Sequence, residues 1–203
     1  MTDPGAQVTR RTLLRAGAAL GAVVAGGGLV SACTPSRSVL AMGDSIMSGA
    51  KLVGFGAATA GGATTWKVDA VVGRGTNRAA TDLAAIDLRT YWMVVVATGT
   101  NDYLDDAATF GTRIDRVMRA TAGHPRVRWV NVDANTTKLA PAANGVNAAL
   151  AAAPRRWSTL RVGDWSHRAA TLSGFDQQRA ADGVHYTYDG YRQWRAFVEA
   201  LAA

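Results

Sequence analysis

Hydrophobic and polar positions along the chain follow two patterns, one typical of strands and one typical of helices. Residues 91–97, Tyr-Trp-Met-Val-Val-Val-Ala, form a continuous apolar run, as expected of a central parallel strand that is covered on both faces. Residues 105–122 instead place apolar side chains every three or four positions, which predicts an amphipathic helix. The side chains on its apolar stripe are Phe110, Ile114, Val117, Met118 and Thr121.

The same two patterns alternate from residue 38 to the C-terminus. Further short apolar runs predict strands at 38–42, 68–72, 127–132 and 159–162. Helices are expected at 46–50, at 77–88, from 144 to about 153 and from about 189 to the end, with Asn77 and Asn144 as caps. The last helix is expected to bury the side that carries Tyr191, Trp194, Val198 and Leu201. Residues 54–65 are a loop rich in Gly, Ala and Thr. This alternation predicts an α/β protein, a three-layer α/β/α sandwich with a five-stranded parallel sheet.

The first 32 residues have the pattern of a bacterial export signal. Residues 9–14, Thr-Arg-Arg-Thr-Leu-Leu, are a twin-arginine motif that leads into a small apolar run at 16–30. That run is too rich in Gly and Ala for a membrane span, which needs roughly 20 strongly apolar residues. Residues 30–33, Val-Ser-Ala-Cys, resemble the lipobox of bacterial lipoproteins, so we expect Cys33 to be the lipidated first residue of the mature chain. The alternative is an ordinary signal cut nearby with a leftover thiol.

Cys33 is the single cysteine, so no internal disulfide is possible. We expect residues 1–32 to be the signal, 33–37 a short tether and 38–203 one domain. Without the signal, the net charge of +7 falls to +5, because Arg10, Arg11, Arg15 and Asp3 are removed. The remaining arginines are scattered and form no basic run, so a nucleic-acid partner is not expected. The expected location is the outer face of the cytoplasmic membrane or the envelope beyond it.

Three polar motifs supply the candidate chemistry. Ser45, in Gly-Asp-Ser-Ile directly after the first predicted strand, is placed at a helix N-terminus. It is either a helix cap or a nucleophile, and a nucleophile needs a base and a stabilised oxyanion. Asp182 and His185, three residues apart, fit a carboxylate that orients the imidazole Nδ1–H and leaves Nε2 facing Ser45. The structural alternative is an Asp-Gly turn followed by an incidental histidine.

Two further residues are candidate donors to an oxyanion. Asn101 follows the most buried predicted strand, where an amide side chain needs hydrogen-bond partners. It is either a turn cap or a donor to a developing negative charge. Gly73 offers a backbone N–H at close range, since glycine allows near approach to a ligand. With the N–H of Ser45 these groups make three donors.

A second Asp-x-x-His pair, Asp164 and His167, has the same spacing as the first. The spacing therefore does not distinguish the two histidines. We favour His185 over His167 as the base because of the sequence that follows His185. Asp164 is interpreted as a carboxylate that holds a loop at a strand end, and His124 as a surface turn residue.

Other chemistries find little support in the sequence. No Gly-x-Ser-x-Gly elbow of an α/β-hydrolase occurs. The three histidines lack metal-ligand spacing and there is no cysteine pair, so no metal is expected. The glycines at 26–28 and 61–62 lack the strand-turn-helix setting of a nucleotide loop, so no cofactor is expected.

These motifs resemble the signature blocks of the SGNH (GDSL) hydrolase family, over essentially all of the mature chain. The four blocks are Gly-Asp-Ser at 43–45, Gly73, Gly-Thr-Asn-Asp at 99–102 and Asp-Gly-Val-His at 182–185. The resemblance implies a flavodoxin-like sandwich in which Ser45 is the nucleophile, Asp182 the orienting acid and His185 the base. It implies that Gly73 and Asn101 donate to the oxyanion together with Ser45.

A narrower resemblance is to the extracytoplasmic SGNH domains of membrane acyltransferases, including peptidoglycan O-acetyltransferases. The segments that carry it are Asp-Ala-Val-Val-Gly-Arg at 69–74, Gly-Asp-Trp at 163–165 and Asp-Gly-Val-His-Tyr-Thr at 182–187. By this likeness Arg74 and Trp165 would contact a glycan. Two departures are that those domains often carry glycine where Asp102 stands, and that this sequence contains no multi-span membrane part.

We therefore expect a lipid-anchored envelope serine esterase that removes a small O-acyl group, acetyl above all, from a cell-wall glycan through an acyl-Ser45 intermediate. An O-acyltransferase, in which a sugar hydroxyl replaces water, would use the same residues. A glycan-binding lipoprotein that kept the fold and lost the chemistry is a further alternative. The motifs leave the acyl length, the sugar and the oligomeric state open.

Overall fold

A computed structural model of the chain describes residues 37–57, 63–121 and 123–203. The predicted export signal, the lipidation site at Cys33 and the tether up to residue 36 lie outside the described residues, and so does part of the predicted loop at 54–65. All described residues belong to one compact unit. In the part of the chain that the structure describes, no helix is both long and apolar enough to cross a membrane.

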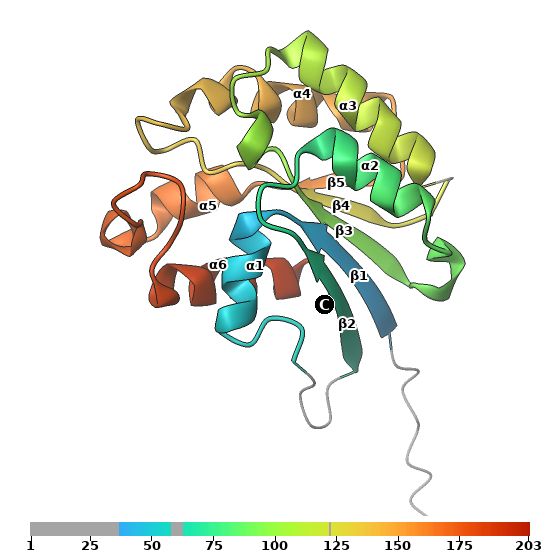
Figure 1. The fold of residues 1–203 in the computed structure, drawn as a ribbon, viewed down its shortest axis with the longest axis horizontal. Helices are drawn as coiled ribbons and strands as arrows, with labels where there is room; N and C mark the ends of the chain where they lie inside the picture. Colours follow the sequence, from blue (N-terminus) through green and yellow to red (C-terminus); the bar gives the residue numbers. More distant parts are fainter. Residues whose placement is uncertain (1–36, 58–62, 122) are drawn as a thin grey trace, which may run out of the picture. The chain divides into compact units, whose positions relative to one another are not determined.

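Five parallel strands form one sheet in the order β2-β1-β3-β4-β5 (Figure 1). Their bounds are β1 Arg37–Gly43, β2 Thr64–Ala70, β3 Met93–Ala97, β4 Val127–Val130 and β5 Leu160–Gly163. The predicted five-stranded parallel sheet is therefore confirmed.

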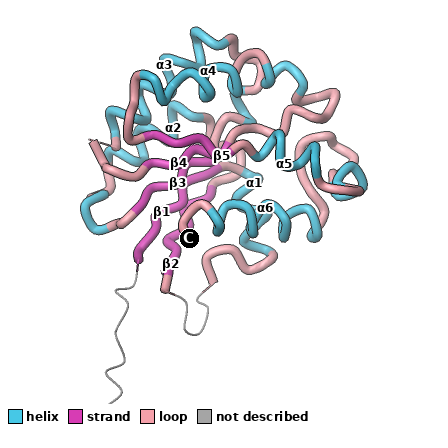
Figure 2. The backbone as a smooth tube through the Cα atoms, turned by 180° about the vertical axis from the view of Figure 1, so that it is seen from behind, coloured by secondary structure: helices cyan, strands magenta, loops and turns pink. Residues whose placement is uncertain are grey.

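Helices cover both faces of the sheet and complete the predicted three-layer sandwich (Figure 2). One face carries α2 Thr76–Ala84, α3 Ala107–Ala120 and α4 Val146–Ala152, and the other carries α1 Ser45–Leu52, α5 Trp165–Thr171 and α6 Tyr188–Ala200. Short 3-10 helices occupy several connections: η1 Leu88–Thr90, η2 Thr100–Asp102, η3 Ala140–Ala143, η4 Ala153–Arg155 and η5 Phe175–Gln178.

The apolar run of β3 is explained by the two hydrophobic cores that the sheet separates. Val94 and Val96 pack into the core under α2, α3 and α4. Met93 and Val95 pack into the core under α1, α5 and α6. Because successive side chains of a strand point to opposite faces, a strand buried on both faces has no polar position.

The prediction for the second strand was wrong in position. It was expected at 68–72, but β2 runs from Thr64 to Ala70 at the edge of the sheet. Val71 and Val72 lie beyond its end and are 40% and 76% exposed. An edge strand is covered less than a central one, so it can contain polar residues. In β2 the polar residues Thr64 and Thr65 pair with β1, while Val71 and Val72 lie outside the strand. Hydrophobicity alone therefore placed the strand too late.

Two helix starts also differ from the prediction. Helix α2 begins at Thr76 after Gly75 and ends before residue 88, and Asn77 is not its cap but accepts a hydrogen bond from Arg116. Helix α4 begins at Val146 after Gly145, because η3 occupies the preceding residues instead of an Asn144 cap. A Cβ atom at position 145 would lie 1.9 Å from the Asp105 carbonyl oxygen, so the close approach of two loops requires glycine there.

Candidate active site

The candidate site lies at the carboxyl edge of the sheet, where the parallel strands end. Ser45 starts α1 after β1, Gly73 follows β2, and Asn101 lies in η2 after β3. His185 and Asp182 come from the loop that leads into α6. Ligands of open parallel sheets bind at this edge because every strand-to-helix loop meets there.

The Gly-Asp-Ser motif places Ser45 at the first position of α1. The Asp44 carboxylate caps the helix by accepting a hydrogen bond from the Ile46 N–H at 3.0 Å. Because Ser45 is the first residue of the helix, its own N–H has no acceptor within the helix and lies at the positive end of the helix dipole. Gly43 is required by packing, since a Cβ there would lie 2.6 Å from the Met47 Cβ.

Ser45, His185 and Asp182 form a continuous hydrogen-bonded chain. Ser45 Oγ lies 2.9 Å from His185 Nε2, and His185 Nδ1 lies 2.6 Å from Asp182 Oδ2. This is the geometry in which a base accepts the serine proton while a carboxylate fixes the tautomer of the imidazole. Among the residues described, His185 is the histidine that reaches Ser45.

Asp182 is held in its ionised form. Its partial burial alone would raise the pKa of the carboxyl, but hydrogen bonds from the His185 ring and from the backbone N–H groups of His185 and Val184 prevail and lower that pKa to about 2. The two backbone bonds are 2.9 and 2.8 Å long and end on Oδ1, which leaves Oδ2 for the imidazole. The loop thus presents one carboxylate oxygen to His185 at any ordinary pH.

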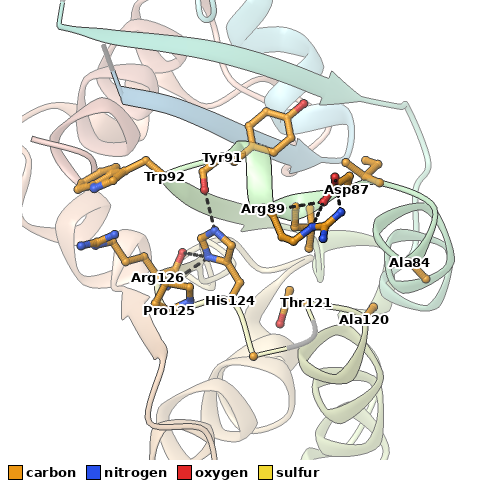
Figure 3. A pocket seen from close by; sticks show the side chains of 13 residues that line it. Ala84, Asp87, Arg89, Tyr91, Trp92, Ala120, Thr121, His124, Pro125 and Arg126 are labelled. Carbon is orange, nitrogen blue, oxygen red and sulfur yellow. Dashed lines mark hydrogen bonds and ion pairs between the residues drawn. The ribbon is translucent and has the colours of Figure 1, made fainter. Parts of the chain in front are cut away.

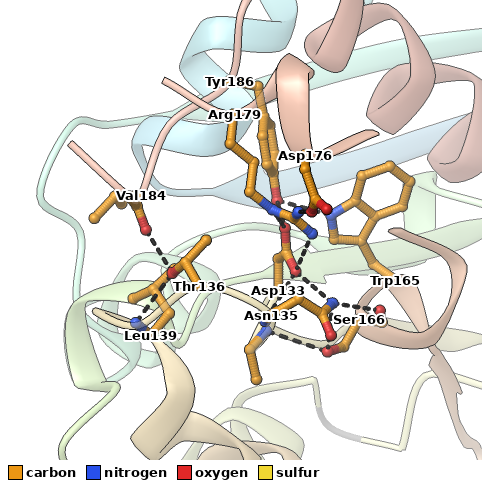
Figure 4. Close-up of polar contacts among 12 residues, drawn as sticks. Asp133, Asn135, Thr136, Leu139, Trp165, Ser166, Asp176, Arg179, Val184 and Tyr186 are labelled. Carbon is orange, nitrogen blue, oxygen red and sulfur yellow. Dashed lines mark hydrogen bonds and ion pairs between the residues drawn. The ribbon is translucent and has the colours of Figure 1, made fainter. Parts of the chain in front are cut away.

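A buried ion pair supports the loop that carries His185 (Figure 4). Arg179 donates to both oxygens of Asp133, at 2.9 and 3.2 Å, and the two side chains are 8% and 2% exposed. The Tyr186 hydroxyl contacts the same carboxylate at 3.4 Å and accepts the Trp165 indole N–H at 2.8 Å. A backbone bridge pairs Arg179 with Tyr186, and Thr136 donates to the Gly183 carbonyl at 2.7 Å. These contacts connect the loop to the segments after β4 and β5.

The two remaining oxyanion candidates lie on neighbouring loops. Gly73 has φ +76°, a conformation that residues with a side chain rarely adopt, and open space where a Cβ would stand. Asn101 Nδ2 donates to the Arg74 carbonyl at 3.2 Å, which ties the loop after β3 to the loop that contains Gly73. An amide nitrogen carries two hydrogens, so one donor of Asn101 remains for a ligand.

Asp102 strengthens the same connection, and sequence reasoning missed this role. Its Oδ2 accepts from the backbone N–H of Thr76 at 2.9 Å and from the Thr76 hydroxyl at 2.7 Å. Arg113 lies 3.3 Å from the other oxygen. Asp102 is 7% exposed, so these bonds are shielded from water. The carboxylate therefore fixes the start of α2, and with it the preceding loop, against η2. Its place directly after Asn101 was the signal that could have revealed it.

Asp44 is a second carboxylate beneath the nucleophile. It is 1% exposed, and in the described structure its Oδ2 has no hydrogen-bond partner. Burial is the main cause that raises the pKa of Asp44 to about 6, against the opposing hydrogen bond from Ile46. The adjoining cavity, which Asp44 and Ile46 help to line, has a volume of about 20 Å³.

Neither predicted glycan contact is available to a ligand. The Arg74 side chain is 3% exposed and donates to the carbonyls of Gly43 and Asp69 at 3.1 and 2.7 Å, while pairing with the Asp69 and Asp82 carboxylates at 2.8 and 3.1 Å. Trp165 is 1% exposed. The expectation that these two side chains bind the sugar is corrected: Arg74 joins β1, β2 and α2, and Trp165 fills the core.

The other two histidines lie elsewhere. His167 is exposed on α5, where its N–H bonds to the helix cap Asp164 at 3.1 Å. Asp164 is thus a helix cap, and α5 itself was not predicted. The interpretation of His124 as a surface residue was wrong, because it is 7% exposed and its ring nitrogens contact the carbonyls of Tyr91 and Arg126 at 3.0 and 3.2 Å (Figure 3).

Solved structures with the same fold are SGNH and related enzymes. The C-terminal catalytic domain of Streptococcus pneumoniae peptidoglycan O-acetyltransferase A has a TM-score of 0.65 and 16% identity, with 82% of this chain and 92% of that chain covered. A lipolytic G-D-S-L family protein from Veillonella parvula has a TM-score of 0.62 and 15% identity, covering 81% and 97%. An acetylxylan esterase from Geobacillus stearothermophilus has a TM-score of 0.62 and 11% identity, covering 81% and 93%.

The chain has the fold of the SGNH (GDSL) hydrolases, as the sequence motifs predicted. No protein-family model matches the chain, and no curated protein is significantly similar to it in sequence.

Proposed function

We propose that the protein is a serine esterase that removes a small O-acyl group from a cell-wall glycan. The observation that carries this proposal is the hydrogen-bonded chain from Ser45 Oγ through His185 to Asp182, at the N-terminus of α1. A serine hydroxyl with a base at 2.9 Å can be deprotonated as it attacks.

The reaction proceeds in two acyl transfers. Ser45 Oγ attacks the ester carbonyl carbon while His185 Nε2 takes its proton, and the oxyanion accepts hydrogen bonds from the backbone N–H groups of Ser45 and Gly73 and from Asn101 Nδ2. His185 then gives its proton to the departing sugar oxygen, and acyl-Ser45 remains. Water attacks this ester, loses a proton to His185, and releases the carboxylic acid and free Ser45. Asp182 keeps the imidazole oriented and stabilises its charged form throughout.

Acetyl is the acyl group that we favour over longer chains. Two proteins of the same fold bear names for chemistry on acetylated glycans, a peptidoglycan O-acetyltransferase and an acetylxylan esterase.

The test combines a fluorophosphonate probe with nitrophenyl esters of increasing chain length. The probe should label Ser45, and the Ser45→Ala variant should remain unlabelled. Acetyl ester should be hydrolysed faster than butyryl and longer esters. Absence of labelling in the folded protein would favour a glycan-binding lipoprotein without catalysis.

Transfer to a sugar hydroxyl is the second candidate, because it uses the same acyl-Ser45. Its support is the fold shared with a peptidoglycan O-acetyltransferase domain. Arg74 and Trp165 are buried, so neither is available to position an acceptor sugar, and we therefore favour water. With nitrophenyl acetate as donor, free acetate should form faster than acetylated peptidoglycan oligosaccharide at millimolar acceptor; the reverse partition would identify a transferase.

We also propose that the protein is exported and anchored through a lipid on Cys33. The support is the twin-arginine motif and the Val-Ser-Ala-Cys sequence at 30–33. Mass spectrometry of the membrane fraction should find an acylated N-terminal Cys33. An unmodified Cys33 in a wholly soluble protein would refute this proposal.

A further inference from the structure

A cluster of arginines surrounds Trp92 at the amino edge of the sheet, the end where the strands begin and opposite the candidate active site. The Arg37 guanidinium carbon lies 4.6 Å from the Trp92 ring centroid, and that of Arg126 lies 4.9 Å from it. Arg37 is the first residue of β1, Trp92 directly precedes β3, and Arg126 directly precedes β4. Two cations that share one indole ring indicate a strongly positive surface.

Two more arginines extend this cluster across the neighbouring strands. Arg128 of β4 and Arg161 of β5 are direct partners in the parallel pairing. Burial, and then the positive charges of Arg161 and Arg126, lower the pKa of the Arg128 guanidinium. Within the described ranges, no carboxylate forms an ion pair with any of the four arginines of this edge. Like charges this close repel one another, so the edge is suited to an anionic partner.

An apolar cavity of about 480 Å³ opens beside the cluster (Figure 3). Trp92 and Arg126 form one side of it, and its apolar lining includes Ile86, Leu88, Tyr91 and Pro125. Asp87, an acid in the lining, is paired with Arg89 at 2.8 Å. Apolar surface with aromatic rings and a cationic rim is the composition of protein surfaces at the boundary between lipid and water.

The position of this edge in the chain points to the same partner. Three residues lie between Cys33 and Arg37, so the chain from one to the other spans at most about 14 Å. A lipid on Cys33 would therefore keep the arginines close to the membrane surface, where electrostatic attraction acts over roughly 8 Å. Strand β1 has seven residues, so Ser45, just beyond its far end, lies roughly 20 Å from Arg37.

We propose that the amino edge, formed by Arg37, Trp92, Arg126, Arg128 and Arg161 with the adjoining cavity, binds the anionic phospholipid headgroups of the membrane. Arginine guanidinium groups donate paired hydrogen bonds to phosphate oxygens, and Trp92 and Tyr91 lie at the headgroup level. The candidate site then faces away from the bilayer toward the wall. This orientation rests on the proposed lipid anchor, whereas the headgroup binding rests on the described residues alone.

The test uses residues 34–203, a segment that lacks Cys33 and the signal, because the described residues form one compact unit with its own cores. Co-sedimentation is measured with vesicles of phosphatidylcholine alone and of phosphatidylcholine with 30% phosphatidylglycerol. We expect binding to the anionic vesicles that weakens as salt is added. Arg37→Gln/Arg126→Gln should reduce the partition coefficient roughly 25-fold, about fivefold for each arginine near the surface.

The matched control is Arg168→Gln/Arg192→Gln, which removes the same charge from exposed sites on α5 and α6. It should bind like the parent, and all variants should hydrolyse nitrophenyl acetate equally, so a failure of headgroup binding is distinct from a failure of catalysis. Equal binding to both vesicle types, or equal losses in the two double variants, would overturn the proposal. Displacement by millimolar glycerol phosphate would also overturn it, in favour of a site for a soluble phosphate ester.

Discussion

The buried pair of Asp133 and Arg179 offers a direct test of how the catalytic loop is held. Replacing Asp133 with alanine leaves the Arg179 guanidinium, 8% exposed, with Asp176 as its remaining carboxylate partner, and Asp176 is 93% exposed. Loss of one partner of a buried pair costs about 3–5 kcal/mol. Because Asp176 retains part of the interaction, we expect a loss near the lower limit, about 3 kcal/mol. For a domain of this size that corresponds to a fall in Tm of roughly 6–12 °C.

The same substitution should slow catalysis, because Arg179 pairs with Tyr186 across the base of the loop that carries His185. A displacement of the imidazole by about 1 Å can cost on the order of 100-fold in rate. We therefore expect kcat to fall more than KM rises, at a temperature well below the lowered Tm. Thermal denaturation and steady-state hydrolysis of nitrophenyl acetate measure the two effects.

Two controls make this reasoning refutable. Asp189→Ala removes one partner of an exposed ion pair with Arg192 and should change Tm by no more than about 2 °C. The double variant Asp133→Ala/Arg179→Met should recover part of the lost stability, since no unpaired buried charge remains. A Tm for Asp133→Ala as high as that of Asp189→Ala, or a double variant whose losses simply add, would show that the buried pair does not hold the loop.

Ser45→Ala and His185→Ala should each abolish turnover while His167→Ala retains most of it, as measured by ester hydrolysis with circular dichroism to check folding; equal damage from His167→Ala would contradict the triad assignment. Asn101→Ala should lower kcat about 10²- to 10³-fold with little change in KM, and a rise in KM alone would instead make Asn101 a substrate-binding or turn residue. Asp44 binds a proton more tightly in the folded protein, since its pKa is raised from 3.8 to about 6. Its contribution to the free energy of unfolding therefore falls as pH rises from about 4 to 6, and it stays unfavourable above that range. Asp44→Asn should remove this fall in stability, which denaturant unfolding at pH 4.5 and 7.5 would detect. An identical pH dependence of stability in the parent and in the variant would refute this prediction.

Sequence alone determined the layer architecture and the candidate nucleophile, base and orienting acid. The reason is that these features are local. Strand and helix periodicity is set by near neighbours, and a parallel sheet brings the loops after its strands to one edge whatever their exact bounds. Asp182 and His185 lie three residues apart, so their contact is made within one turn of the chain. Ser45 begins a helix because Asp44 beside it is a good cap.

Tertiary structure decided every role that depends on residues far apart in the sequence. Burial of Arg74, Trp165 and His124 is produced by long-range packing, and a buried side chain does not reach a substrate however well its motif resembles a glycan site. The second strand was placed too late because Val71 and Val72 are apolar but lie outside the sheet.

The basic amino edge shows the same limit most clearly. Arg37, Arg126, Arg128 and Arg161 are scattered along the sequence, and their spacing forms no basic run. They become neighbours because the strands that carry them pair in a fixed register, with Arg128 directly beside Arg161. The charge density of a surface depends on distances in space, so only the folded sheet assembles this positively charged surface.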